Sequence, residues 1–292
     1  MHRFRLPLAL PLLLAVALDL SAALDPAQLA AARELYGLRK DPEARAAYEK
    51  LAAADPRNAE AQHYLGLLAM RRDDSETAVK FLEAAVALNP GSGEYHRRYG
   101  DACGRTAQKA GVLAKLGWAR KCRLAYEKAV ELDPKSLDAR FSLMGFYQQA
   151  PGIAGGGMDK AYAQAGEIRK LDPARGRIAF ANLYVSDKKY SEAFSLYQET
   201  LKDSPDDYSA LYQTGRLAAD TGERLDHGLA ALRTCLAQTP PADQPGHAAA
   251  HWRIGVIQEK QNDKAAARAS YETALKLDPS FRRAQESLKN LK

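Results

Sequence analysis

Apolar and small residues recur at intervals of three and four along most of the chain, the spacing of one face of a helix. The pattern is clearest when positions are counted back from seven prolines. The position twelve residues before each proline is always small, and the position eight before it is Tyr, Leu or, once, Ala. The prolines are Pro56, Pro90, Pro134, Pro173, Pro205, Pro240 and Pro279.

Each of these prolines predicts the end of a helix, because proline cannot continue a helix and biases the preceding residue towards extended backbone. A small residue at a fixed position predicts that a second helix approaches closely. The upstream segments carry glycine after an apolar or polar residue, as in Tyr99-Gly100, Thr214-Gly215 and Ile254-Gly255. The chain is therefore predicted to consist of successive pairs of helices.

This pattern resembles the tetratricopeptide repeat, a helix–turn–helix unit of 34 residues with small, aromatic and proline positions of this kind. The clearest copy is 248–281, with Trp252, Ala267, Tyr271 and Pro279. The resemblance implies an all-α fold, a right-handed superhelical solenoid with a concave groove lined by first helices. We expect seven units, at 25–58, 59–92, 93–136, 137–173, 174–207, 208–247 and 248–281, and a capping helix at 282–292.

Residues 1–23 have a different pattern. Arg3 and Arg5 precede a short apolar run, Leu6 to Leu18, and Ser21-Ala22-Ala23 supplies small residues after it. A basic start, an apolar centre and a small-residue end are typical of a secretory signal peptide, so we expect cleavage after Ala23 and a periplasmic or secreted protein. The alternative is an uncleaved membrane anchor, for which the run is short.

The composition adds two exclusions. A chain with 46% hydrophobic and 27% charged residues is neither wholly disordered nor a polytopic membrane protein. A net charge of +6 is also too small to favour a nucleic-acid-coating protein. The excess positive charge lies in one region, because residues 96–135 hold ten basic and four acidic residues.

Two repeats contain extra residues between their first and second helices. The insertions fall within 103–118 and within 150–158, and we expect them as neighbouring loops on one edge of the solenoid. Basic residues in and just after the first insertion form a predicted basic edge of the solenoid. They are Arg105, Lys109, Lys115, Arg120 and Lys121. The other interpretation is an ordinary solvated basic helix.

Helical spacing also predicts a stripe along the first helices that would face the groove. Aromatic residues, arginine and asparagine there are types that dominate protein-binding hot spots or hydrogen-bond a peptide. The candidates are Arg97, Phe141, Asn182, Tyr212, Arg216 and Trp252, with Tyr212 and Trp252 as anchors. In the alternative interpretation the aromatic residues only pack between neighbouring repeats.

No candidate chemistry accompanies these surfaces. The sequence contains no Gly-x-Ser-x-Gly, His-Glu-x-x-His or Cys-x-x-Cys motif, and His247 and His251 have no third metal ligand beside them. Cys103 and Cys122 are expected on facing helices, either as a disulfide or as packed thiols. We therefore expect no enzyme, metal or cofactor.

The resulting hypothesis is an exported scaffold that binds a protein or peptide partner through its groove, with no nucleic acid and no membrane span after signal removal. The alternative is an envelope component that binds an acidic polymer or an anionic surface through the basic edge around residues 96–135.

Overall fold

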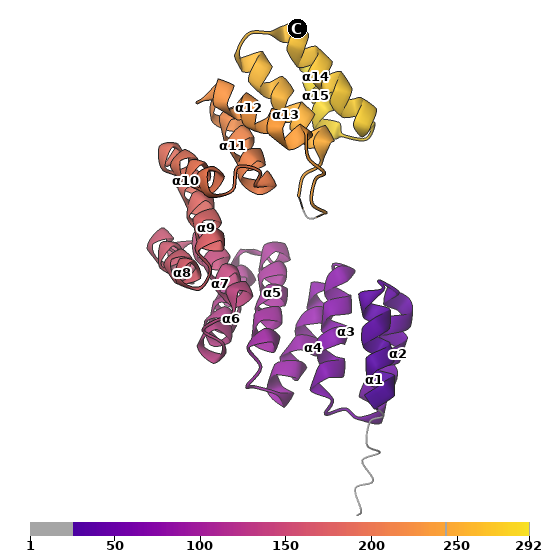
Figure 1. The fold of residues 1–292 in the computed structure, drawn as a ribbon. Helices are drawn as coiled ribbons and strands as arrows, with labels where there is room; N and C mark the ends of the chain where they lie inside the picture. Colours follow the sequence, from indigo (N-terminus) through magenta and orange to yellow (C-terminus); the bar gives the residue numbers. More distant parts are fainter. Residues whose placement is uncertain (1–25, 243, 292) are drawn as a thin grey trace, which may run out of the picture. The chain divides into compact units, whose positions relative to one another are not determined.

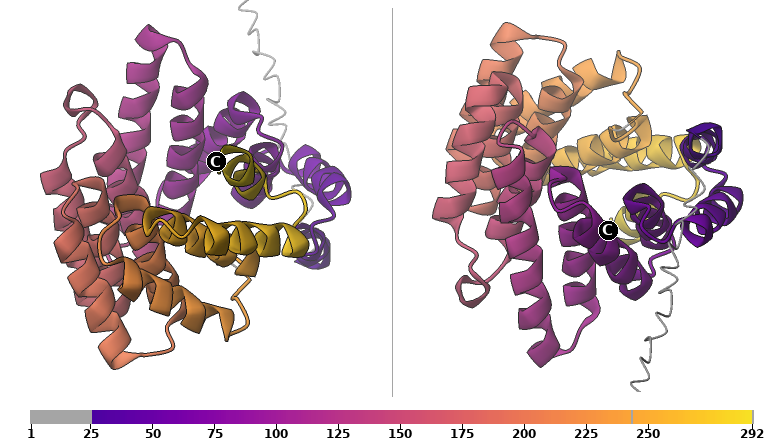
Figure 2. Two further views of the ribbon diagram at one scale, coloured as in Figure 1. Left: turned by 90° about the horizontal axis from the view of Figure 1, so that it is seen from above. Right: turned by 90° about the horizontal axis from the view of Figure 1, so that it is seen from below.

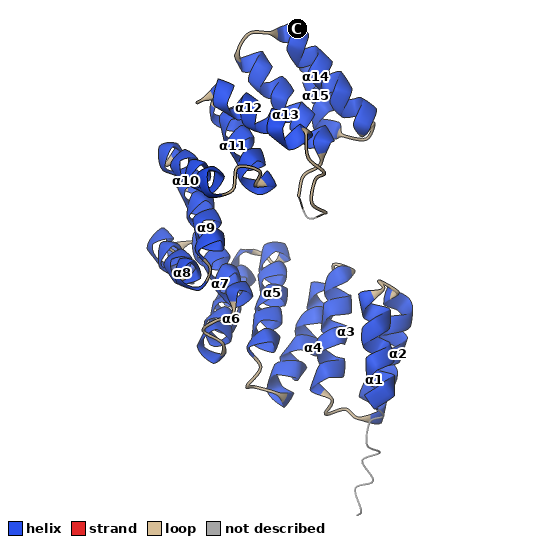
Figure 3. Ribbon diagram, in the orientation of Figure 1, coloured by secondary structure: helices blue, strands red, loops and turns tan. Residues whose placement is uncertain are grey.

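The computed structural model describes residues 26–242 and 244–291, and the predicted signal segment at 1–23 lies outside them. The described residues form fifteen α-helices and one short 3-10 helix (Figure 3). The all-α prediction is therefore confirmed. None of the helices described is long and apolar enough to cross a membrane.

The helices fall into two units, each described here by itself. The first unit, Met1–Pro90, contains α1 (Pro26–Gly37), α2 (Asp41–Ala54), α3 (Ala59–Arg71) and α4 (Ser75–Leu88).

The second unit, Gly91–Lys292, contains the remaining helices. These are α5 (Gly93–Lys109), α6 (Val112–Leu132), α7 (Leu137–Gln149), η1 (Gly152–Ala154), α8 (Met158–Leu171), α9 (Pro173–Ser186), α10 (Tyr190–Asp203), α11 (Tyr208–Thr221), α12 (Leu225–Leu236), α13 (His247–Lys260), α14 (Lys264–Leu277) and α15 (Arg282–Asn290). The two helices of each repeat lie side by side in the views of Figures 1 and 2.

The helix ends follow from the local sequence. Side-chain oxygens of Asn58, Ser136 and Asp207 accept hydrogen bonds from the backbone N–H three residues later, which satisfies donors that the first helical turn leaves unpaired. At the other end, α14 stops at Leu277 and α4 at Leu88, each two residues before a proline of the predicted series.

In four repeats the close contact between the two helices depends on a glycine of the first helix, at Gly66, Gly100, Gly215 and Gly255. A Cβ atom placed on Gly255 would lie 2.4 Å from Cε1 of Tyr271, and one on Gly66 would lie 2.5 Å from Cγ of Leu82. The residue covering the glycine is the one eight positions before the proline. The pairing of a glycine on the first helix with this residue on the second therefore reflects a close approach of the two helices.

The first insertion differs from its prediction. Residues 103–118 do not form a loop but lengthen both helices of the pair, so that α5 has 17 residues and α6 has 21. The expectation of a loop was wrong because the added residues are mostly helix formers such as Ala, Leu, Lys and Gln. Only Ala110 and Gly111 leave the helix, and in both views of Figure 2 the turn that they form points away from the rest of the second unit.

The second insertion does form a loop, which includes η1. It contacts α6, the second helix of the preceding repeat, and Gly155 lies beside Arg123, which follows the first insertion in the sequence. Nζ of Lys160 donates a hydrogen bond to the carbonyl oxygen of Gly155 at 3.0 Å, which ties the loop to the start of α8. This contact fixes the backbone beside the long α5–α6 pair.

Candidate functional site

All six residues of the predicted groove lie on first helices of the second unit. Arg97 is on α5, Phe141 on α7, Asn182 on α9, Tyr212 and Arg216 on α11, and Trp252 on α13. They occupy the fifth or the ninth position of their repeats, so we call the surface that they define the first-helix face. Their exposure differs, and it separates packing residues from candidate binding residues.

Tyr212 belongs to the packing residues. Its side chain is only 5% exposed and lies in an apolar cluster with Leu211, Leu217 and Ile254. The interpretation in which aromatic residues pack between neighbouring repeats therefore describes Tyr212, and an anchoring role for it would require the core to open.

Arg97 is 8% exposed and already paired. Its Nε donates to Glu94 at 2.8 Å, and its guanidinium lies 3.7 Å from a carboxylate oxygen of Asp101 and 4.0 Å from one of Asp138 on α7. These carboxylates balance its charge and link α5 to α7. Arg97 is consequently a structural residue in this conformation.

Phe141, Asn182 and Arg216 remain partly exposed on α7, α9 and α11. Arg216 lies beside Tyr197 of α10. Burial raises the pKa of the Tyr197 hydroxyl, and the positive charge of Arg216 opposes that rise. A partly exposed arginine beside an aromatic residue is suited to hold a carboxylate or a backbone carbonyl of a peptide.

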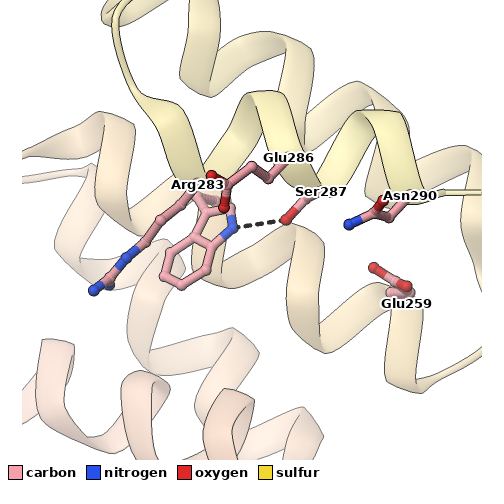
Figure 4. Close-up of a pocket in the computed structure, with 6 residues that line it drawn as sticks. Glu259, Arg283, Glu286, Ser287 and Asn290 are labelled. Atoms are coloured by element: carbon pink, nitrogen blue, oxygen red, sulfur yellow. Dashed lines mark hydrogen bonds between the residues drawn. The ribbon is translucent and has the colours of Figure 1, made fainter.

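Trp252 is partly covered by α15. Its indole Nε1 donates a hydrogen bond to Oγ of Ser287 at 3.0 Å, drawn as a dashed line in Figure 4. Its ring also meets that of Phe281 edge to face, with the ring centroids 6.0 Å apart. The guanidinium of Arg283 lies 5.2 Å from the ring centroid. A pocket of about 360 Å³ opens here, lined by Trp252, Glu259, Arg283, Glu286, Ser287 and Asn290.

This pocket was not predicted from the sequence. Helical spacing placed Trp252 on the groove and the repeat pattern indicated a cap at 282–292, but neither indicated that the two meet. The only available signal was the polar face of the capping segment, with Arg283, Glu286 and Asn290 at helical spacing.

All five residues of the predicted basic edge are exposed, and they surround the turn between α5 and α6. Arg105 and Lys109 lie on α5, whereas Lys115, Arg120 and Lys121 lie on α6. Nζ of Lys121 is 4.8 Å from the centroid of the Trp118 ring, within the range of a cation–π interaction. The five basic residues therefore lie on the exposed parts of these two helices.

The side chains of Cys103 and Cys122 are both buried, on the paired helices α5 and α6. Burial, with a smaller contribution from Cys103, raises the pKa of Cys122 to about 12. A thiol with such a pKa stays protonated at neutral pH and is a poor nucleophile.

Among the described residues, no three His, Cys, Asp or Glu side chains are arranged to hold a metal ion. Nε2 of His247 lies 2.7 Å from the carbonyl oxygen of Gln238, and burial lowers the pKa of His251. His247 therefore has a local structural partner at the start of α13.

The comparisons with known proteins agree with this architecture. Family models described as tetratricopeptide repeat match residues 29–93, 107–136, 178–242 and 248–281, about two thirds of the chain. Among curated protein sequences, none is significantly similar to this chain.

Similar solved structures share the fold at low sequence identity. A tetratricopeptide repeat protein from Parabacteroides merdae ATCC 43184 has a TM-score of 0.65 and 15% identity, covering 91% of this chain and 98% of that one. Yeast Tom70 has a TM-score of 0.63 and 15% identity, covering 87% of this chain and 51% of that one. The chain belongs to the tetratricopeptide repeat family, whose repeat domains are typically non-catalytic scaffolds for protein–protein interaction.

Proposed function

We propose that this protein is an exported scaffold that binds a protein or peptide segment along the first-helix face of its second unit. The observation that carries the proposal is the run of partly exposed residues on successive first helices, with Phe141 at the fifth position of its repeat and Asn182 and Arg216 at the ninth position of theirs. Aromatic and arginine side chains are enriched in binding hot spots, and an amide can hydrogen-bond a peptide backbone.

The structure changes which residues we expect to contact the partner. Tyr212 and Arg97 hold repeats together, so their replacement would disturb folding before it tested binding. Asn182 and Arg216 are the better probes, since both are partly exposed. We expect Trp252 to contact the partner through the part of its side chain that lines the pocket beside α15.

Affinity capture from a cell-envelope extract, followed by mass spectrometry, would identify the partner. The captured protein would then be titrated calorimetrically against the wild type and an Asn182→Ala, Arg216→Ala variant. We expect at least tenfold weaker binding, because a hydrogen bond to a charged group contributes about 1.5–3 kcal/mol.

Arg233→Ala is the matched control, because Arg233 is exposed on α12, the second helix of the same repeat. Equal affinity of all three proteins for the partner would exclude the first-helix face. Retained far-ultraviolet circular dichroism of each variant would show that the effect is not unfolding.

Export has a separate test. The order of basic, apolar and small residues in 1–23 supports cleavage by a signal peptidase. Amino-terminal sequencing of protein purified from the envelope fraction should therefore begin at Leu24. Recovery of the intact Met1 terminus from that fraction would favour a membrane anchor instead.

A further inference from the structure

The turn between α5 and α6 forms an exposed tip on the second unit. From residue 108 to residue 121 no side chain is buried, whereas Ala107 on one side and Cys122 on the other belong to the core. The tip exists because α5 and α6 are longer than the helices of the next repeat, α7 and α8, with 13 and 14 residues. It is therefore a surface on which no other described helix of the unit packs.

Large apolar side chains lie at this tip without cover. Val112 is 87% exposed, Leu113 is 96% exposed and Leu116 is 41% exposed. They occupy the first two turns of α6, and Trp118 follows on the same helix. A soluble repeat gains no stability from such positions, and grouped exposed apolar residues mark an interaction surface.

The charges around these residues are all of one sign. Residues 102–126 contain no Asp or Glu, and the tip itself carries Lys109, Lys115, Arg120 and Lys121. The first turn of α6 also has no side-chain cap, so its backbone N–H groups and the positive end of the helix dipole lie at the tip. A partner surface that fits the tip therefore carries negative charge and has an apolar layer beneath that charge.

We propose that this tip docks on the surface of a bilayer that contains anionic phospholipid. Val112, Leu113 and Leu116 enter the boundary between headgroups and acyl chains, while the four basic side chains contact lipid phosphates. The tip combines Leu and Trp with Lys and Arg. This combination is typical of segments that lie in the membrane interface rather than cross the membrane.

The apolar residues distinguish this surface from a site for an acidic polymer. An anionic glycan or an acidic unfolded protein would be attracted by the charge alone and would leave Val112 and Leu113 in water. A bilayer satisfies both features, because anionic headgroups attract the basic residues and acyl chains accept the apolar ones. The dependence of binding on Leu113 is thus the decisive measurement.

The experiment uses the chain lacking residues 1–23 and sedimentation with vesicles of phosphatidylcholine alone or with phosphatidylglycerol added. We expect binding only to the phosphatidylglycerol vesicles. Glutamine at Lys109, Lys115, Arg120 and Lys121 should weaken binding by about fivefold for each charge removed. Val112→Ser with Leu113→Ser should weaken it by roughly tenfold or more, because two apolar side chains no longer leave water.

Matched controls exist in the same unit. Leu171→Ser with Leu277→Ser changes two exposed apolar residues outside the tip, and Lys188, Lys202, Lys264 and Lys276→Gln removes the same charge elsewhere. Both control proteins should bind as the wild type does. Circular dichroism checks that every variant is folded.

Trp118 supplies a direct reading of insertion. The sequence has two tryptophans, so a Trp252→Phe variant leaves Trp118 as the only one. Its emission should shift to shorter wavelength with phosphatidylglycerol vesicles and should not shift with dextran sulfate. The proposal is overturned if no vesicles are bound, or if binding is unchanged by Val112→Ser with Leu113→Ser and is equalled by dextran sulfate.

These outcomes are independent of the scaffold proposal. The first-helix face is tested with Asn182 and Arg216, which lie on α9 and α11, and none of the tip substitutions changes those helices. Loss of vesicle binding with retained partner binding would therefore assign two separate surfaces to one molecule.

Discussion

Glycine residues on the first helices determine how closely the two helices of a repeat can pack. At Gly255 the space for a side chain is already filled by Tyr271, which is fully buried. The aromatic ring cannot move away without disturbing the core around it, because protein interiors are close-packed. The same relation holds between Gly215 and Leu232.

Gly255→Ala should consequently lower the free energy of unfolding by about 1–3 kcal/mol, the usual effect of overpacking a core. Gly166 on α8 is the matched control, because a Cβ there would meet no atom within 4 Å. Gly166→Ala should stabilise by up to about 1 kcal/mol, as expected for removing glycine from a helix. Urea unfolding followed by circular dichroism measures both, and a destabilisation of equal size in the two variants would contradict the packing argument.

A second prediction for single residues concerns the oxidation state of the three cysteines. Burial raises the pKa values of Cys122 and Cys235 to about 12, so both thiols are protonated at pH 8. We expect Ellman's reagent to label them slowly in the native protein and to detect three thiols after denaturation without reductant. Detection of a single thiol would show that Cys103 and Cys122 form a disulfide.

At the scale of helices, the repeat boundaries were readable because prolines, small residues and glycines each have a direct steric effect. The conformation of the insertion at 103–118 could not be predicted in the same way. Comparison with a 34-residue repeat identifies extra residues but does not show whether they form a loop. Their composition favours helix, and the structure places them in α5 and α6. The exposure of Val112 and Leu113 then follows from helix length, which the repeat pattern does not contain.

The binding surface shows a second limit of the sequence. Spacing alone places Tyr212 and Trp252 on one stripe, but it does not distinguish a side chain directed at a groove from one that packs on the next repeat. Tyr212 packs within the cluster shared by α11 and α13, and Trp252 packs on α15. That difference depends on tertiary contacts between repeats, which helical periodicity does not record.

The contact between α13 and α15 can be measured by a double-mutant cycle. Ser287→Ala removes the acceptor for Trp252 Nε1, and Trp252→Phe removes the donor. The loss of this hydrogen bond should cost about 0.5–1.5 kcal/mol. The two changes should be non-additive by a similar amount, because they delete one shared interaction. Additive effects in urea unfolding would mean that the bond does not stabilise α15.

At the scale of the whole molecule, the chain consists of repeats that contact mainly their sequence neighbours. In such arrays the stability is approximately a sum of repeat and interface contributions, so a local change should affect nearby repeats most. We expect cooperativity to be weakest at the division between Met1–Pro90 and Gly91–Lys292. A small substitution can therefore be used to ask which helices open together.

Gly66→Ala and Gly215→Ala introduce the same kind of overpacking, the first against Leu82 in the first unit and the second against Leu232 in the second. Hydrogen exchange followed by mass spectrometry should show faster exchange in α3 and α4 for Gly66→Ala, with α11 to α14 unchanged. Gly215→Ala should give the reverse, because α11 and α12 pack on each other through that glycine. Faster exchange in all helices of both variants would mean that the chain opens as one cooperative unit, and the two groups of repeats would then share a single unfolding transition.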